Sequence, residues 1–216
     1  MTKIDIISGF LGAGKTTLIK LMLGFYPPTE GTVTIGRQSL QKISFKEWRK
    51  HCGVVMQEGF IFGDTIANNI VPDGNMIDKK RLLYAVEMAN IRDFVESLPL
   101  KYNTKIGNTG QGLSQGQKQR ILIARAVYKD PLYIFLDEAT NALDAKNERT
   151  IVENLDQFYK GRTVVVVAHR LSTVKNAHQI IVLDKGRIVE TGNHASLIEE
   201  KGAYYNLVKN QLELGN

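Results

Sequence analysis

The chain has 216 residues with a net charge of +6, and 43% of its residues are hydrophobic and 23% charged, as in an ordinary globular protein. This length allows one domain or a core with a subdomain, and no apolar run approaches the ~18–20 residues of a membrane-spanning helix. Cys52 is the only cysteine, so an intrachain disulfide is excluded; no secretory leader is visible, and we expect a cytoplasmic location. The positive charge is compatible with binding to a nucleic acid, an acidic membrane surface or a nucleotide, but the basic residues are scattered without a run of five, which disfavours a nucleic-acid patch.

The first elements form a strand, a glycine-rich turn and a helix. A short apolar strand is expected over Lys3–Ser8, and the helical pattern Leu18–Leu23 follows the turn. The turn fits G-x-x-x-x-G-K-[ST], the phosphate-binding loop. Its backbone N–H groups and the helix N-terminus bind phosphate oxygens, Lys15 reaches the β- and γ-phosphates, and the Thr16 hydroxyl can ligand Mg²⁺. The expected nucleotide contacts are Gly9, Leu11, Gly12, Ala13, Gly14, Lys15, Thr16 and Thr17.

A group of helices interrupts the strands further along the chain. After a turn at residues 26–31, the patterns predict a strand over Thr32–Ile35, a short helix over 45–50 and a strand over Cys52–Gln57. Residues 58–129 then read as an inserted helical subdomain. Its predicted helices are Thr65–Ile70, Asp78–Ala89, Ile91–Leu98 and Gln115–Tyr128, with a polar loop over Tyr102–Gly112.

The strand pattern returns after residue 130. Strands are expected over Leu132–Glu138 and Thr163–His169, a helix over 145–158, a hairpin around Asp184–Gly186 and a helical tail over 194–214. Strands that alternate with helices predict an α/β fold of the P-loop NTPase type, with a mostly parallel sheet flanked by helices. Residues 1–57 and 130–216 would form this ATPase core.

Four of the predicted strands end in polar residues. These residues are Ser8, Gln57, the pair Asp137-Glu138, and His169. Taken alone, Asp137-Glu138 is more often a solvated strand end, and His169 is more often a packed or surface histidine. Parallel neighbouring strands would, however, bring these side chains together beside the phosphate loop. Asp137 would then hold Mg²⁺ through water, Gln57 would bridge Mg²⁺ and the attacking water, Glu138 would act as general base, and His169 would donate to the γ-phosphate.

A further motif, Leu113-Ser114-Gln115-Gly116-Gln117, opens the longest predicted helix of the insertion. Ser114 is a good N-cap residue, and Gly116 allows close backbone approach, so this is a second anion-binding helix end. Plain capping is the alternative interpretation. Within one chain, a single γ-phosphate does not need two helix N-termini. The second helix end would have a role there only if it came from another copy of the chain.

These motifs, in this order, resemble the nucleotide-binding domain of an ATP-binding-cassette (ABC) transporter over nearly all of the chain. Gly9–Thr17 corresponds to Walker A, Gln57 to the Q-loop, Leu132–Asp137 to Walker B, Asn141–Asp144 to the D-loop, and His169 to the H-loop. Leu113–Gln117 resembles the LSGGQ signature, with Gln115 in place of its first glycine. The resemblance implies ATP and Mg²⁺ as cofactors and a head-to-tail homodimer, in which Ser114, Gly116 and Gln117 face the nucleotide of the partner copy. Ile61–Ile70 and Gly186–His194 resemble the exporter branch, whose transmembrane domains this chain lacks.

The opening of the chain departs from that family. ABC domains carry a longer segment before Walker A, with an aromatic residue that stacks on adenine, so its absence predicts weak binding with little preference for ATP over GTP. The stretch from Met1 to Thr17 instead resembles CobW-type metallochaperone GTPases, although we find neither their metal-binding cysteine motif nor a guanine-reading [NT]-K-x-D motif after the core strands. One hypothesis is therefore an engineered or recombined chimera, and the alternative is a divergent natural fragment.

Three functions are compatible with the motifs. The first is an ATPase module that drives transport when joined to membrane helices. The second is a folded nucleotide-binding scaffold with little turnover. The third is an ABC ATPase of the DNA-repair type, although the heptads of its long coiled coils are missing here.

Overall fold

The computed structural model describes residues 3–8, 14–71, 76–107, 110, 112–139, 143, 145–168 and 174–214. Its contacts divide the chain into two compact units. Unit 1 consists of Met1–Cys52, Leu132–Glu138 and Arg162–Asn216, and unit 2 of Gly53–Pro131 and Ala139–Gly161. Unit 2 thus contains the helical insertion expected over 58–129 together with the helix expected over 145–158.

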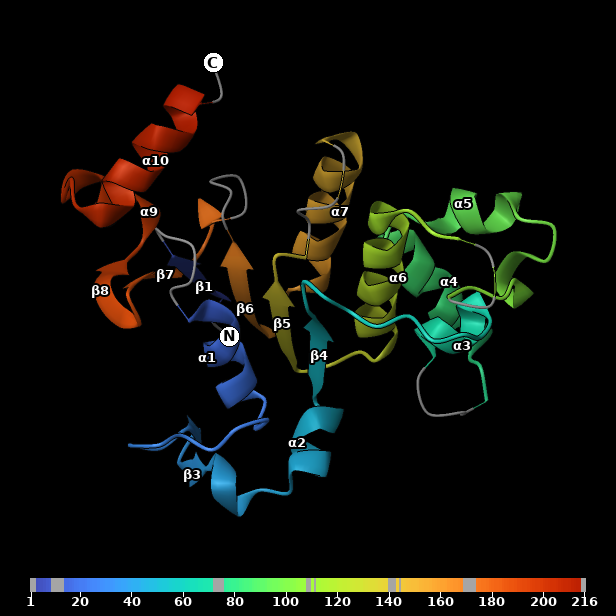
Figure 1. Cartoon of the computed structure of the whole chain (residues 1–216), viewed down its shortest axis with the longest axis horizontal. Helices are drawn as coiled ribbons and strands as arrows, with labels where there is room; N and C mark the ends of the chain where they lie inside the picture. The colour runs from blue at the N-terminus through green and yellow to red at the C-terminus, as the bar shows by residue number, and fades with distance from the viewer. Residues whose placement is uncertain are drawn as a thin grey trace. The chain divides into compact units, whose positions relative to one another are not determined.

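A six-stranded sheet organises the fold, in the order β4-β5-β6-β1-β7-β8 (Figure 1). Strands β5, β6, β1 and β7 run parallel to one another, and β8 pairs antiparallel with β7. The predicted α/β fold with a mostly parallel sheet is confirmed. The strand bounds are β1 (Lys3–Ser8), β4 (Cys52–Val55), β5 (Tyr133–Asp137), β6 (Thr163–Ala168), β7 (Gln179–Asp184) and β8 (Arg187–Gly192).

The register of the parallel strands brings their carboxyl ends to one edge. Asp137, the last residue of β5, lies opposite Val167 of β6, and Ala168 at the end of β6 lies opposite Ile7 of β1. The apolar runs that predicted these strands fill the core: Ile134, Leu136, Val164, Val165, Val166 and Val167 are all buried. The polar residues that follow these apolar runs, at the carboxyl ends of the strands, are the candidates for a functional site.

Unit 1 also contains a small two-stranded sheet and several helices. Helix α1 packs against β5, and α9 and α10 pack on β8. The carboxylate of Glu190 in β8 accepts hydrogen bonds from the N–H groups of Ala203 and Tyr204, the first residues of α10. The bounds are α1 (Lys15–Met22), β2 (Thr34–Ile35), β3 (Gln38–Ser39), η1 (Leu40–Lys42), α2 (Phe45–Lys50), α9 (His194–Glu199) and α10 (Ala203–Leu214).

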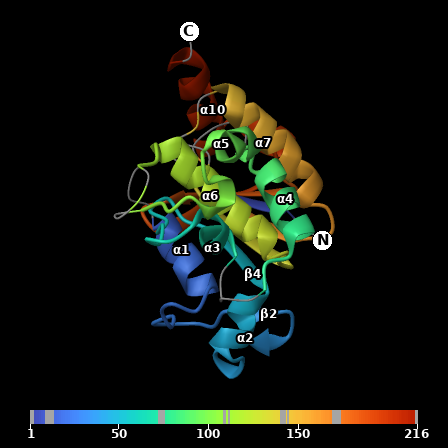
Figure 2. The same ribbon diagram turned by 90° about the vertical axis from the view of Figure 1, so that its right-hand side faces the viewer.

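Unit 2 is built around α6, whose inner face is buried and which packs against α3 and α4 (Figure 2). Helix α7 packs on α4, which is why the contacts place α7 in this unit. Apart from the one-turn helix η3, its helices begin and end within two residues of the predicted bounds. They are α3 (Ile66–Ile70), α4 (Lys79–Met88), α5 (Arg92–Ser97), η3 (Lys101–Asn103), α6 (Gln115–Tyr128) and α7 (Ala145–Phe158).

Two local predictions need adjustment. Strand β4 ends at Val55, so Gln57 lies in the turn that follows and not at the end of the strand. The loop expected over Tyr102–Gly112 opens in the one-turn helix η3, and Lys105 pairs with Thr65 in an isolated bridge. Within the described part of the chain, no helix combines the length and the apolar character needed to cross a bilayer.

Candidate functional site

The start of α1 has the features of a phosphate-binding helix end. Gly14 precedes the helix with φ 81° and ψ 14°, a left-handed conformation that glycine adopts without a steric penalty. The carbonyl of Gly14 accepts the first helical hydrogen bond, from Leu18 N at 3.0 Å. The first turn of α1 contains no acidic residue of its own that would offset the partial positive charge of the helix end. The predicted contacts Gly9, Leu11, Gly12 and Ala13 lie outside the described residues.

Two side-chain oxygen atoms that could hold a metal meet beside this helix end. Thr16 Oγ1 donates a hydrogen bond of 2.7 Å to Asp137 Oδ2, which joins the first turn of α1 to the end of β5. Asp137 is only 1% exposed. A hydroxyl and a buried carboxylate are hard oxygen donors of the kind Mg²⁺ prefers, and Mg²⁺ is usually held by one or two carboxylates together with substrate phosphates and water. Among the described residues no cluster of three or more His, Cys, Asp or Glu side chains could hold a metal by itself. One hydroxyl together with one carboxylate fits Mg²⁺ that arrives with a nucleotide.

Lys15 lies next to these carboxylates and is 8% exposed. Burial lowers the pKa of its ammonium group, and the negative charges of Glu138 and Asp137 act in the opposite direction. An approaching phosphate would add further negative charge and stabilise the ammonium form. Thr17, next in α1, is exposed.

Glu138 has an unusual backbone. Its φ is 52°, in the left-handed region that costs a residue other than glycine about 1–2 kcal/mol. Its N–H donates to the carbonyl of Val167 at 3.1 Å, which holds the residue at the end of the paired strands. Backbone strain of this kind persists where surrounding structure maintains it, and it is common at catalytic positions. The positive φ of Glu138 is thus an indication of a functional position that the amino-acid sequence does not contain.

The signature segment lies in unit 2 at the start of α6. Ser114 Oγ accepts a hydrogen bond from Gln117 N, and Gln117 Oε1 accepts one from Ser114 N, which forms a reciprocal capping box. A serine hydroxyl that accepts one hydrogen bond still has its own O–H to donate. Ser114 is exposed and Gly116 half-buried, so plain capping and anion binding are both open to this helix end.

The other predicted site residues belong to unit 2 or lie outside the described residues. Gln57 is exposed, in the turn after β4 and within unit 2. His169 and the D-loop residues Asn141, Ala142 and Asp144 lie outside the described residues, whereas Leu143 is buried. Of the expected constellation, the structure brings together Lys15, Thr16, Asp137 and Glu138.

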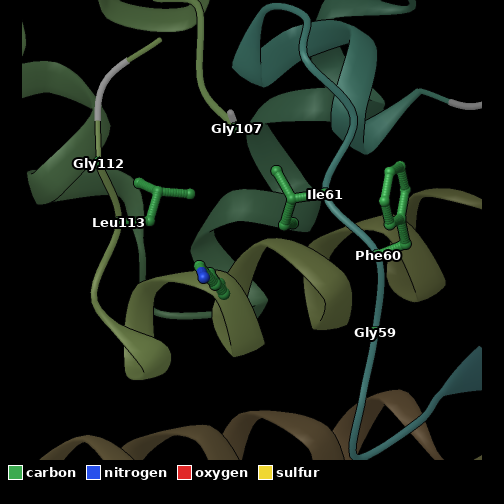
Figure 3. Close-up of a pocket in the computed structure, with 7 residues that line it drawn as sticks. Gly59, Phe60, Ile61, Gly107, Gly112 and Leu113 are labelled. Atoms are coloured by element: carbon green, nitrogen blue, oxygen red, sulfur yellow. The ribbon is translucent and has the colours of Figure 1, made fainter. Parts of the chain in front are cut away.

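Unit 2 also contains a cavity of about 340 Å³. Its walls come from the segment after Gln57 and from the two sides of the signature loop, and the side chains of Ile61 and Leu113 point toward each other across it (Figure 3). The lining residues are Gly59, Phe60, Ile61, Gly107, Gly112, Leu113 and Lys118.

Asn69 and Arg125 hold the cavity wall in place. The side chain of Asn69, which is 0% exposed, accepts from Phe62 N and donates to the carbonyls of Phe62 and Thr65. Arg125 donates to the carbonyls of Asn69 and Phe60. These contacts supply hydrogen bonds to a loop that has no regular secondary structure.

We expect Asn69→Ala to lower the free energy of unfolding by about 2–4 kcal/mol, because several part-buried backbone groups would lose their partners at about 1–3 kcal/mol each. Thermal and urea denaturation measure the change. Asn68→Ala is the matched control, since Asn68 is exposed and its side-chain amide makes one hydrogen bond, to Asp64. Equal stability of the two variants would contradict this role for Asn69.

Sequence reasoning missed a connection between α6 and α7. Arg120 donates to the carbonyl of Asn90 at 2.7 Å, and Asn90 Nδ2 donates to Asn147 Oδ1 at 2.9 Å. The signature helix is thereby joined to the first turns of the helix that follows the D-loop. Nothing in the spacing of these three residues predicts their contact.

Helix α1 begins with a lysine and a threonine, and the buried aspartate at the end of β5 lies at hydrogen-bond distance from that threonine. Together with the parallel sheet, these features define a nucleotide-binding protein of the P-loop class. A family model described as "ABC transporter" matches residues 3–141. The chain therefore belongs to the ABC transporter family.

The similar proteins are exporters. Over 203 residues the chain is 45% identical to an ATP-dependent lipid A-core flippase of Saccharophagus degradans, a match that covers 94% of this chain and 35% of the flippase. It is 44% identical over 209 residues to ABC transporter B family member 17 of Arabidopsis thaliana, covering 95% and 17% of the two chains. Among solved structures, a bacterial Atm1-family ABC exporter with ATP bound superposes with a TM-score of 0.93 at 36% identity, over 98% of this chain and 37% of that one.

These matches confirm the predicted resemblance to the nucleotide-binding, ATPase domain of an ABC exporter. The chain spans about a third of the length of the flippase it matches. The family match begins at residue 3 and runs through the phosphate loop without a break, so the comparisons give no support to a chimera joined near Thr17.

Proposed function

We propose that this chain binds ATP with Mg²⁺ and hydrolyses the nucleotide, as the ATPase domain of an exporter at the cytoplasmic face of a membrane. ABC ATPase domains in general bind ATP and Mg²⁺. The observation that carries the proposal for these particular residues is the 2.7 Å hydrogen bond between Thr16 and Asp137, beside the buried Lys15. It joins the two motifs that such chemistry needs.

Each residue of the site then has a distinct role. Lys15 binds the β- and γ-phosphate oxygens, and the backbone N–H groups of residues 9–17 surround them. Thr16, Asp137 and Gln57 would hold Mg²⁺, which when bound neutralises charge that develops on the phosphates. Glu138 accepts a proton from the attacking water. His169 donates a hydrogen bond to the γ-phosphate.

A second copy of the chain completes the proposed site. Ser114 Oγ accepts a hydrogen bond in the capping box and keeps its own O–H to donate, and N–H groups in the first turn of a helix have no carbonyl partner within it, so this helix end suits a γ-phosphate held by a partner. We propose a head-to-tail homodimer with two nucleotides, in which Ser114, Gly116 and Gln117 act across the interface. In a transporter, transmembrane domains would be the further partner.

Phosphate release tests this proposal directly. We expect the parent chain to release phosphate from MgATP at a rate per chain that rises with protein concentration, because the active species is a dimer. Binding without release at any concentration would favour the nucleotide-binding scaffold. Failure to bind MgATP at all would refute the proposed function.

Action across the interface predicts the behaviour of Ser114→Arg. We expect this variant to lose turnover while its monomer binds nucleotide like the parent, because the arginine would occupy the place of the partner's γ-phosphate. Mixing it with Lys15→Ala should restore part of the activity, since a mixed dimer has one site with two intact halves. Absence of rescue in confirmed heterodimers would count against the dimer model, and Ser97→Arg, on the exposed end of α5, is the control.

A further inference from the structure

A second connection joins α1 to β5, at the end of the helix away from the phosphates. Trp48 of α2, the only tryptophan of the chain, is 6% exposed. Its indole Nε1–H donates a hydrogen bond of 2.9 Å to the carbonyl of Met22, the last residue of α1. Carbonyl groups in the last turn of a helix have no partner within the helix, so this donor satisfies a group that would otherwise need water.

The same indole also contacts the start of β5. Its ring lies 4.7 Å from that of Tyr133, centroid to centroid, with a tilt of 58°. The N–H groups of Leu132 and Tyr133 both donate to the carbonyl of His51 at 3.0 Å, so the end of α2 is held against the beginning of this strand. Trp48 therefore links the C-terminal end of α1 to the first residue of β5.

The two connections lie at opposite ends of the same pair of elements. Helix α1 has eight residues and is about 12 Å long at 1.5 Å per residue, and β5 has five residues and spans about 16 Å. At one end Thr16 and Asp137 share a hydrogen bond of 2.7 Å, and at the other Trp48 contacts both Met22 and Tyr133. Because a short helix moves as a rigid body, the position of Thr16 relative to Asp137 depends on where the far end of α1 is held.

We infer that Trp48 is a positioning residue for the Mg²⁺ site, a role that rests on the proposed function. By holding the C-terminal end of α1 against the start of β5, it sets the separation between the Thr16 hydroxyl and the Asp137 carboxylate. Mg²⁺ demands near-ideal octahedral geometry, so its binding is sensitive to this separation. The N–H groups of the first turn and the Lys15 side chain move together with α1. Phosphate binding without metal is therefore much less sensitive to the position of α1 relative to β5.

Trp48→Phe tests this inference, because phenylalanine keeps an aromatic ring but lacks the N–H donor. Calorimetric titration of ATP in Mg²⁺ and in EDTA gives the gain in affinity that the metal brings. We expect that gain to fall by about 2- to 10-fold, as the loss of one hydrogen bond implies, while the affinity in EDTA stays within about twofold of the parent.

Tyr204→Phe is the matched control. It also removes one donor from a buried aromatic side chain of unit 1, since the hydroxyl of Tyr204 lies 2.7 Å from His194 Nδ1. It leaves α1 and β5 unchanged. We expect a similar fall in melting temperature for the two variants but an unchanged gain from Mg²⁺ for Tyr204→Phe, which separates positioning from general stability.

The outcomes distinguish the two hypotheses. A parent chain that does not bind MgATP refutes the proposed function. A parent that binds, with a Trp48→Phe variant that keeps the full gain from Mg²⁺ or that loses affinity equally in EDTA, overturns the positioning role. If Trp48→Phe does not fold, Tyr133→Leu decides in the same way, because it removes the ring under the indole at a half-buried position.

Discussion

Replacing Lys15 with alanine is expected to abolish measurable ATP binding. The negative charges of Glu138 and Asp137 act on its pKa against the effect of burial, and the side chain is held in a buried position at the start of α1. Without it, the β- and γ-phosphates would lose their lysine contact, while the two carboxylates would remain beside them. Calorimetric titration with MgATP measures the loss.

Lys20→Ala is the matched control for this experiment. Lys20 belongs to the last turn of the same helix, so the substitution removes the same charge and the same side chain from α1 but at the opposite end. We expect it to bind ATP like the parent. If Lys15→Ala bound ATP as tightly as Lys20→Ala, the assignment of the phosphate loop would be wrong.

Glu138→Gln is expected to keep nucleotide binding and to slow hydrolysis by about 10²–10⁴-fold, the usual effect of removing a positioned general base. Glutamine has nearly the shape of glutamate and can adopt the same left-handed backbone at φ 52° with the same strain, so the loss reports on the carboxylate. Removal of a negative charge beside the γ-phosphate should also stabilise the ATP-bound dimer.

Single-turnover phosphate release measures the rate, and size-exclusion chromatography in MgATP detects the dimer. Glu153→Gln, on the exposed face of α7 where its carboxylate pairs with Arg149, removes the same charge outside the site and should hydrolyse ATP like the parent. An active parent together with a Glu138→Gln variant of equal rate would exclude Glu138 as the base.

The predictions from sequence were most successful where the determining interactions are local. The bounds of α6 and α7 and the capping role of Ser114 follow from helical spacing and from residues three or four positions apart, so they are encoded within one window. The runs that predicted β1, β5 and β6 are apolar because both faces of a parallel sheet are covered. The phosphate motif likewise carries its own context of strand, turn and helix.

The sequence by itself therefore determined the class of fold, the family, and the residue types at the candidate site. Only the tertiary structure decided which of those residues meet. Thr16 and Asp137 are 121 residues apart, and Trp48 and Met22 are 26 apart, so strand order and helix packing, which no local pattern encodes, bring them together. The left-handed backbone of Glu138, whose N–H donates to the carbonyl of Val167 in β6, likewise appears only in the folded chain, and α7 belongs to unit 2, where it packs on α4. Long-range contacts of this kind depend on how the whole chain folds, so patterns among neighbouring residues do not predict them.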